Sequence, residues 1–283
     1  MHDQGLIKNS LQIYSSLKTN SSHNIIPKIT DISRATKEVP YLQYLKLALN
    51  QQLAHGLFTR HGGVSSAPFQ SLNISYSVGD RREDVTKNIL GIKEAIGAER
   101  LFFLDQSHKN EILLLRKGQD KAPEKNISAD AMITDIPGMA LLIKQADCQG
   151  VIVFDPKKRV VANVHCGWRG NVQNILESVI KKLKKDFACN ASDLLAAIGP
   201  SLGPCCAEFK SYDKIFPRSF HSFMVRENYF DLWAISTRQL MDAGLREENI
   251  ELARICTRCR TDLFFSFREE GTTGRFGTVA MLL

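Results

Sequence analysis

The sequence MALLIKQADCQGVIVFDPKKRVVANVHCGWRG, residues 139–170, contains three short apolar runs separated by polar and turn residues. Met139–Gln145, residues 150–154 and residues 160–164 have the length and side chains typical of buried strands. Between the second and third runs, Asp155-Pro156-Lys157-Lys158 has the composition of a tight turn. This stretch therefore predicts one strand followed by a β-hairpin.

Outward from this stretch, strand-like and helix-like segments alternate from about residue 53 to the end of the chain. Helices are predicted at Arg82–Ala95 and at residues 171–185 and 229–241. Further strands are predicted at residues 53–59, 101–104, 112–116, 194–198, 250–255 and 263–267. Because crossovers are short and hairpins recur, the pattern favours an α+β fold with mixed rather than purely parallel sheets.

The domain organisation follows from the absence of a linker. No Pro-, Gly- or Ser-rich stretch interrupts residues 51–283, so we expect a single domain there. Residues 1–50 are rich in Ser, Asn and Lys, with only a weak amphipathic patch near residues 41–47. We expect them to form an N-terminal extension that is partly flexible.

Composition and charge exclude several classes of protein. With 43% hydrophobic and 24% charged residues in 283, the chain can bury a core, so it is not wholly disordered. No apolar run approaches the roughly 18 residues that cross a bilayer, and residues 1–30 lack the apolar stretch of a signal peptide. We therefore expect a cytoplasmic protein without a membrane partner. The net charge of +7 comes with no RNA- or DNA-binding motif, so no nucleic-acid partner is predicted.

Three residues that can bind a metal stand where predicted strands meet loops. His108 follows the strand at residues 101–104, Cys148 follows Met139–Gln145, and His165 follows the second strand of the hairpin. Two imidazoles and one thiolate suit zinc, and three protein ligands leave the fourth tetrahedral position for water or substrate. The spacing alone leaves open that both histidines are ordinary hydrogen-bonded residues.

The same residues allow two other interpretations. Cys148 could be a thiolate nucleophile with His165 as its base, which would make the protein a cysteine hydrolase or amidase. Alternatively, the domain could be a non-enzymatic module that binds a metal or a partner, with residues 1–50 as its docking element. Stoichiometric zinc would distinguish a zinc enzyme from a cysteine hydrolase, because the ion would occupy the thiolate.

The other cysteines could form disulfides, bind a metal or be buried thiols. Seven cysteines without an export signal argue against a disulfide framework. Cys256 and Cys259 have CxxC spacing, and Cys205-Cys206 could complete a four-cysteine zinc site with them. Vicinal cysteines are poor tetrahedral partners, however, and no second CxxC exists. We therefore interpret them as buried or incidental thiols, with a structural metal or a redox pair as alternatives.

A series of motifs runs in order through residues 53–283. It consists of Thr59-Arg60-His61-Gly62-Gly63-Val64-Ser65, Ser71-Leu72-Asn73, Val78-Gly79-Asp80, Ala129-Asp130-Ala131, Ala146-Asp147-Cys148, His165-Cys166-Gly167-Trp168-Arg169-Gly170, Ile198-Gly199-Pro200, Pro204-Cys205-Cys206, Phe264-Phe265-Ser266-Phe267-Arg268 and Thr273-Gly274-Arg275. This series resembles the YfiH family, the laccase-domain proteins later recognised as purine nucleoside phosphorylases. The departures are local: Gln149-Gly150 stands in place of the family's Leu-Pro, Ser107 in place of Val and Cys166 in place of Ala.

The resemblance implies a fold, a metal site and an activity. The fold would consist of mixed sheets packed face to face with flanking helices, similar to cysteine-hydrolase toxin domains, and zinc would be bound by His108, Cys148 and His165. The activity would be phosphorolysis of adenosine, inosine, guanosine and methylthioadenosine, with deamination of adenosine. Copper is disfavoured, because a laccase needs several coppers and paired histidines, and none of the seven histidines forms a His-x-His pair.

Purine nucleosides and phosphate are thus the expected small-molecule partners. Arg60 and Arg169 are candidates for binding phosphate, because a guanidinium offers paired, permanently charged donors, although surface or structural roles fit both equally. Asn73 could position the ribose or the base, or could simply stabilise a turn. The usual nucleobase-deaminase signature is missing, so deamination would need another acid/base group, for which Asp147 is a candidate.

Overall fold

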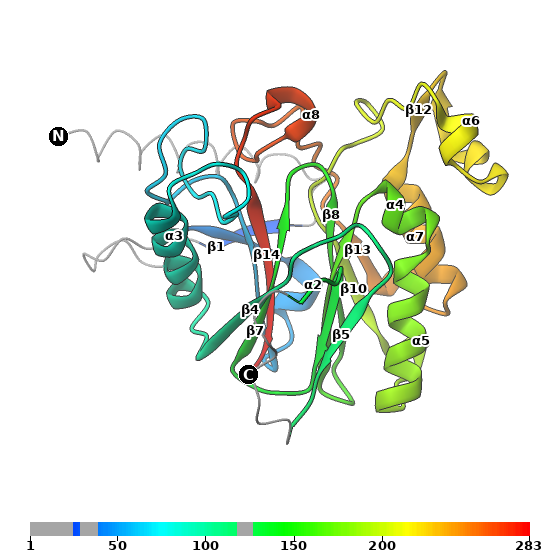
Figure 1. Ribbon diagram of the computed structural model, residues 1–283. Coiled ribbons are helices and arrows are strands. Elements are labelled where there is room, and N and C mark those ends of the chain that lie inside the picture. The colour runs from blue at the N-terminus through cyan, green and yellow to red at the C-terminus, as the bar shows by residue number, and fades with distance from the viewer. Residues whose placement is uncertain (1–24, 29–38, 118–126) are drawn as a thin grey trace.

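The computed structural model describes residues 25–28, 39–117 and 127–283 (Figure 1). At its centre is the predicted hairpin, formed by β8 (Gln149–Asp155) and β9 (Val160–Cys166), in which every residue is buried. Oδ1 of Asp155 accepts hydrogen bonds from the backbone N–H groups of Lys157 and Lys158, at 2.8 and 2.9 Å, and so closes the turn. Burial on both faces means that the hairpin lies between two layers.

Two six-stranded sheets account for most of the strands. In spatial order, the first contains β1 (Ile25–Lys28), β2 (Tyr41–Tyr44), β3 (Leu53–Phe58), β14 (Phe276–Leu282), β7 (Met139–Gln145) and β4 (Arg100–Phe103). The second contains β13 (Ile250–Leu252), β10 (Leu195–Ile198), β8, β9, β6 (Ala131–Thr134) and β5 (Ile112–Leu115). Most pairs are antiparallel, but β4–β7, β5–β6 and β10–β13 are parallel. The sheets are therefore mixed, as predicted.

The two sheets pack face to face, mainly through β7 and β14 on one side and β8 and β9 on the other. Fully buried side chains such as Leu141, Phe154 and Val161 fill the space between them. A polar side chain also crosses this layer: Nδ2 of Asn163 donates hydrogen bonds to the carbonyl oxygens of Leu141 and Thr278, both at 2.8 Å. The expected α+β class, with face-to-face sheets and flanking helices, is confirmed.

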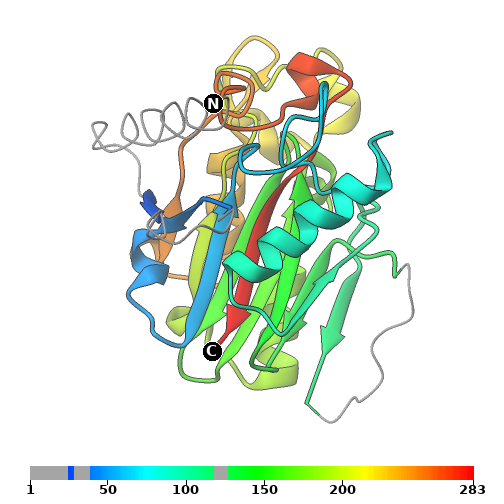
Figure 2. The same ribbon diagram turned by 90° about the vertical axis from the view of Figure 1, so that its left-hand side faces the viewer.

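Helices α3 (Arg82–Ala95), α5 (Ile175–Phe187) and α7 (Leu232–Asp242) cover the outer faces of the two sheets. The other helices of the described residues are α2 (Leu45–Ala48), α4 (Trp168–Val172), α6 (Tyr212–Ile215) and α8 (Phe267–Glu270), with short 3₁₀ turns at Ala191–Asp193, Arg218–Phe223 and Glu247–Asn249. Figure 2 shows α3 crossing the outer face of the first sheet, where Val85, Ile89 and Ile92 pack. α5 and α7 lie over the second sheet. Within the described residues, no helix is long and apolar enough to span a membrane.

Three local predictions differ from the structure. The helix predicted at residues 171–185 is divided into α4 and α5, because Asn174 adopts a left-handed conformation and its side chain caps α5. Tyr229 lies in a two-residue strand, β12 (Tyr229–Phe230), which pairs with β11 (Met224–Arg226), and α7 begins only after the cap Asp231. Residues 263–266 form a turn and irregular backbone rather than a strand, and Phe267 begins α8. Leu263, Phe264 and Phe265 are buried in the core between the sheets, whereas Phe267 is exposed.

The beginning of the chain is only partly described. Residues 1–24 and 29–38 of the predicted extension lie outside the described residues. The rest of it belongs to the first sheet: β2 pairs with β3, and Leu42, Tyr44 and Leu47 are buried in the core. The predicted boundary at residue 50 therefore does not coincide with an edge of the fold.

Candidate functional site

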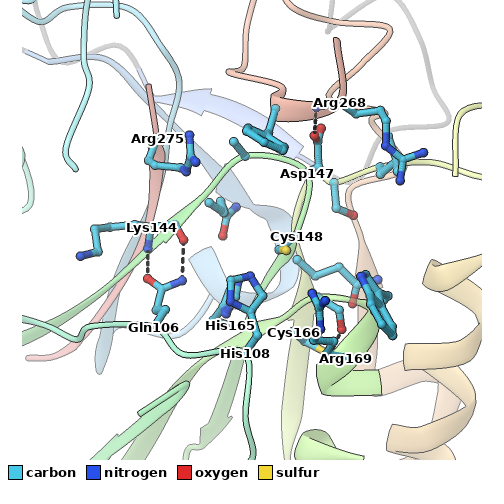
Figure 3. A pocket seen from close by; sticks show the side chains of 18 of the residues that line it. Gln106, His108, Lys144, Asp147, Cys148, His165, Cys166, Arg169, Arg268 and Arg275 are labelled. Carbon is cyan, nitrogen blue, oxygen red and sulfur yellow. Dashed lines mark hydrogen bonds between the residues drawn. The ribbon is translucent and has the colours of Figure 1, made fainter. Parts of the chain in front are cut away.

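His108, Cys148 and His165 come together where β7 and β9 end, at the end of the sheets opposite the C-terminus (Figures 1 and 3). One possible ligand atom from each residue lies within 4.8 Å of those of the other two. The two imidazole rings meet edge to face, with 4.8 Å between centroids. The structure thus unites three residues that lie far apart in the sequence, through the loops that follow β4 and β7 and the last residues of β9.

Asp130, just before β6, organises the two histidines. Its Oδ1 lies 2.8 Å from Nδ1 of His165 and accepts the backbone N–H of His108 at 2.9 Å. Its Oδ2 accepts the backbone N–H of Lys109 and the hydroxyl of Ser107, at 2.8 and 3.1 Å. One buried carboxylate therefore fixes both the ring of His165 and the loop that carries His108. Asp130 stands within the motif Ala129-Asp130-Ala131, but the sequence pattern alone does not indicate its role.

The charges of Cys148 and His165 stabilise each other. Burial by itself would raise the pKa of the Cys148 thiol, but His165 and His108 outweigh it and lower that pKa to about 6. Burial would likewise lower the pKa of His165, yet Cys148 and Asp130 raise it to about 9. Both shifts favour a thiolate beside an imidazolium at neutral pH when no metal ion is bound.

Gly167 leaves room for these side chains. A Cβ atom at this position would lie 2.6 Å from Sγ of Cys148 and 3.7 Å from Cδ2 of His108. Any other residue would push the sulfur out of place. The soft thiolate, the two imidazoles and the space beside them fit a zinc ion with three protein ligands.

A cavity of about 820 Å³ opens above these residues (Figure 3). Four cationic side chains line it: Lys144, Arg169, Arg268 and Arg275. Lys144 is held at the cavity by Gln106, whose side-chain amide donates to the carbonyl oxygen of residue 144 at 2.7 Å and accepts its N–H at 2.8 Å. Burial lowers the pKa of Lys144. The cavity therefore combines positive charge with a metal-binding set, which suits an anionic reactant.

Aromatic side chains line another part of the same cavity. Trp168, Phe209 and Phe267 contribute to its wall, and the guanidinium of Arg169 lies 4.3 Å from the Trp168 ring centroid. Aromatic surface of this kind can stack against a planar base. Among the predicted substrate residues, Arg169 is the one at the cavity.

Arg60 and Asn73 do not line this cavity. The guanidinium of Arg60 pairs with Glu270 at 2.8 Å and donates to the backbone oxygens of Gln70 and Thr261. Asn73 is buried, and its side chain bonds the backbone N–H groups of Ser75 and Arg275. Both residues thus hold loops together, and their contact with substrate stays a prediction.

Asp147 is also engaged structurally. Its Oδ1 accepts the hydroxyls of Thr257 and Ser266, both at 2.7 Å, and its Oδ2 accepts the backbone N–H of Arg268 at 2.6 Å. Asp147 has φ of 85°, a left-handed conformation. These contacts hold the residue before Cys148 against two other loops, which favours a positioning role over proton transfer.

Comparison with known proteins identifies the family. Residues 54–283 match the family model described as multi-copper polyphenol oxidoreductase laccase. The chain belongs to this laccase family. The purine nucleoside phosphorylase of Bacteroides thetaiotaomicron is 32% identical over 254 residues, which cover 83% of this chain and 93% of the relative. Purine nucleoside phosphorylase YfiH of Escherichia coli is 29% identical over 236 residues, covering 80% and 92%. The predicted membership of the YfiH family is confirmed.

Solved structures of this laccase family have the same fold. YlmD from Geobacillus stearothermophilus matches with a TM-score of 0.77 and 30% identity, covering 88% of this chain and 97% of that one. The hypothetical protein YfiH of Bacillus licheniformis matches with a TM-score of 0.79 and 26% identity, covering 88% and 98%.

The family name mentions several coppers, but the potential ligands differ from those of such a centre. In the described part of the chain, two groups of His, Cys, Asp or Glu can hold a metal ion: the site above and a cluster of four cysteines. Only the first contains histidine, and it contains two. Neither group provides the many imidazoles that a multicopper oxidase requires.

Proposed function

We propose that this chain is a zinc-dependent purine nucleoside phosphorylase that also deaminates adenosine. The observation that carries the proposal is the convergence of His108, Cys148 and His165 in a cavity with four cationic side chains. The relatives named purine nucleoside phosphorylase support it, because the alignment with the B. thetaiotaomicron protein spans most of both chains. The proposed substrates are adenosine, inosine, guanosine and methylthioadenosine, each with phosphate.

Zinc would be bound by one imidazole nitrogen of His108, one of His165 and the sulfur of Cys148. A carboxylate accepts and does not donate, so the hydrogen bond to Asp130 places a proton on Nδ1 of His165 and leaves Nε2 for the metal. When bound there, zinc would act as a Lewis acid toward a substrate oxygen and stabilise developing negative charge. Asp130 would keep the His165 ring oriented throughout.

Phosphorolysis joins an oxygen of phosphate to C1′ of the ribose and breaks the bond from C1′ to the purine nitrogen. The base takes the electron pair of that bond and a proton. Lys144 and Arg275 lie on one side of the cavity (Figure 3) and would bind the phosphate as it approaches C1′. Arg275 is already oriented, because its Nη1 donates to the carbonyl oxygens of Thr273 and Gly274 at 3.0 and 2.9 Å. Trp168 and Phe209 would stack on the purine.

The decisive experiment supplies nucleoside with and without phosphate. Zinc-loaded protein incubated with adenosine and phosphate should release adenine and ribose 1-phosphate, and Cys148→Ala and His108→Ala should abolish this product. The matched control is His221→Asn, which changes an exposed histidine outside the cavity. Omitting phosphate should leave only inosine and ammonia from deamination. A fully metallated sample that forms neither product would reject the proposal.

A cysteine hydrolase or amidase remains the second candidate, because Cys148, His165 and Asp130 also have the order of nucleophile, base and orienting carboxylate. The two activities respond to zinc in opposite ways. Zinc would block a nucleophilic Cys148 but support phosphorolysis. Activity on amides that rises after chelation, together with rapid alkylation of Cys148, would favour the hydrolase.

A further inference from the structure

Four cysteines form a second cluster outside the cavity described above. Cys205 and Cys206 lie in the loop after β10, and Cys256 and Cys259 lie in the loop after β13. All four sulfur atoms lie within 4.8 Å of one another, and none of the four residues lines the catalytic cavity. Two loops that are about fifty residues apart in sequence therefore present their thiols to one point.

The spacing of the sulfurs fits a metal centre. Sγ of Cys259 lies 3.6 Å from that of Cys205 and 3.5 Å from that of Cys206. A tetrahedral zinc ion with Zn–S bonds of about 2.3 Å places its sulfurs roughly 3.8 Å apart. The four side chains are thus close to the positions that one ion requires, with no large backbone movement.

A tight turn explains how adjacent cysteines reach the same point. The backbone N–H groups of Cys206 and Ala207 both donate to the carbonyl oxygen of Gly203, at 2.9 Å, so the chain reverses between residues 203 and 207. A Cβ at Gly203 would lie 2.8 Å from the Trp233 ring and 3.0 Å from Cβ of Cys256, so glycine allows the two loops to approach. The turn therefore allows the two adjacent cysteines to reach the same point, although vicinal cysteines are usually poor tetrahedral partners.

Hydrogen-bond donors and cations lie beside the sulfur atoms. The backbone N–H of Gly203 donates to Sγ of Cys256 at 3.3 Å. Arg226 donates to the carbonyl oxygen of Cys205 at 3.0 Å, and Arg258 stands between Cys256 and Cys259 in the chain. Two guanidinium groups therefore lie beside a cluster that would carry net negative charge once four thiolates bind a divalent cation.

We propose that Cys205, Cys206, Cys256 and Cys259 bind one zinc ion in a closed structural site. Four soft sulfur ligands select zinc over the harder cations and leave no open position for substrate. The site is separate from the proposed catalytic zinc, and it does not depend on the proposed activity.

The ion would clamp two loops that support the catalytic cavity. The backbone N–H of Thr257 donates to the carbonyl oxygen of Ser201 at 3.0 Å, beside the cluster. The Thr257 hydroxyl bonds Asp147 at 2.7 Å, and the backbone N–H of Leu202 bonds the carbonyl oxygen of Asp147 at 2.8 Å. Both clamped loops thus hold the residue that precedes Cys148, so the structural ion fixes one wall of the active site.

Metal content in a Cys148→Ala background tests the proposal without relying on turnover. The full-length C148A protein should retain about one zinc ion per chain, and C148A/C259S should retain none. C148A/C259H should keep the ion, because histidine can replace a zinc ligand, and this rescue distinguishes lost ligation from general damage. C148A/C189A, which changes a cysteine outside both groups, is the matched control. Circular dichroism confirms that each variant is folded.

Cobalt substitution gives an independent readout. Co²⁺ in C148A should produce strong thiolate-to-metal charge-transfer absorption and the visible bands of a tetrahedral ion, and both should disappear in C148A/C259S. Equal zinc in C148A and C148A/C259S would overturn the proposal. So would iron in place of zinc, or a disulfide among these four cysteines in protein purified anaerobically.

Discussion

Asp130 and His165 form a buried hydrogen bond, with 2.8 Å between Oδ1 and Nδ1 and with side chains that are 1% and 3% exposed. Burial by itself would raise the pKa of Asp130, but His165 and the N–H groups of Lys109 and His108 lower it to about 2. Asp130 is therefore a charged acceptor at neutral pH, and it links the imidazole of His165 to the backbone of His108. Partners of this kind usually set the orientation and basicity of a metal-binding histidine.

Replacing Asp130 by Asn should weaken metal binding and catalysis together. The amide removes the negative charge and offers an N–H group where His165 needs an acceptor, so the ring would lose its fixed tautomer. We expect zinc affinity and kcat/KM for adenosine to fall by about 10–100-fold. Competition with a chelating dye and steady-state kinetics would measure both. Asp135→Asn, at the other end of β6, should change neither; equal losses in both variants would contradict this role.

Gly167→Ala should displace the Cys148 sulfur. The added methyl group would lie 2.6 Å from Sγ, which is too close for two non-bonded atoms, and the thiolate would have to rotate away from both imidazoles. We expect a large loss of zinc occupancy and only a small loss of thermal stability. Gly170→Ala is the control, because its Cβ would meet side-chain atoms of Ile175 and Cys166 at 3.3 and 3.5 Å and the carbonyl oxygen of His165 at 3.7 Å, none of them as close as the 2.6 Å at Gly167. Full zinc content in Gly167→Ala would show that the close approach has no role in binding.

The elements that were predicted correctly are those that local sequence determines. The β8–β9 hairpin combines two apolar runs with a turn closed by Asp155, and α3 coincides with the predicted range Arg82–Ala95. Residues 263–267 were predicted wrongly because an apolar run of this length is compatible with a strand, whereas tertiary contacts bury Leu263, Phe264 and Phe265 in a turn and Phe267 begins α8. Composition gives no information about which contacts form.

The residues of the site also differ in how far the sequence alone predicts them. His108, Cys148 and His165 could be singled out as candidate ligands because few residue types bind zinc and each lies at or after the end of a predicted strand. Asp130, Lys144 and Arg275 acquire their positions only through folding, and Asp and Arg in a sequence are usually surface residues. The convergence of the four cysteines was not predicted, because the sequence does not reveal the turn at Gly203 that brings Cys205 and Cys206 to the same point.

Arg275 and Arg60 should respond differently to loss of charge. Arg275→Gln removes a cation from the cavity and should raise KM for phosphate by about 10–100-fold, the range expected for a charge-assisted contact. Arg60→Gln should instead lower the free energy of unfolding, because Arg60 bonds Glu270 and two backbone oxygens outside the cavity. Phosphate titrations and urea unfolding of both variants would check this. A larger phosphate KM in Arg60→Gln than in Arg275→Gln would support the original prediction for Arg60.

Glu251 should make stability depend on pH. This glutamate, on β13, is 1% exposed, and its Oε2 accepts the backbone N–H of Lys46 at 3.0 Å at the start of α2. Burial raises its pKa above the ordinary value, although N–H donors and the charge of Lys46 act in the opposite direction. In the folded state Glu251 therefore holds its proton to higher pH than in the unfolded state.

The sign follows from the linkage between proton binding and folding. Below about pH 4.3 both states are protonated, and Glu251 contributes no difference. As the pH rises, the unfolded state ionises first and is stabilised, so the free energy of unfolding falls until the folded state also ionises. Glu251→Gln removes this loss, and each unit of pKa difference corresponds to about 1.4 kcal/mol. The variant should therefore gain stability relative to the parent between acidic and neutral pH.

Urea unfolding of parent and Glu251→Gln across this pH range would measure the effect. Glu248→Gln, at an exposed position nearby, is the control and should follow the parent at every pH. A difference between parent and Glu251→Gln that is constant with pH would mean that Glu251 ionises equally in both states. A difference that instead favours the parent more strongly toward neutral pH would mean that its carboxylate is stabilised by the N–H groups of α2.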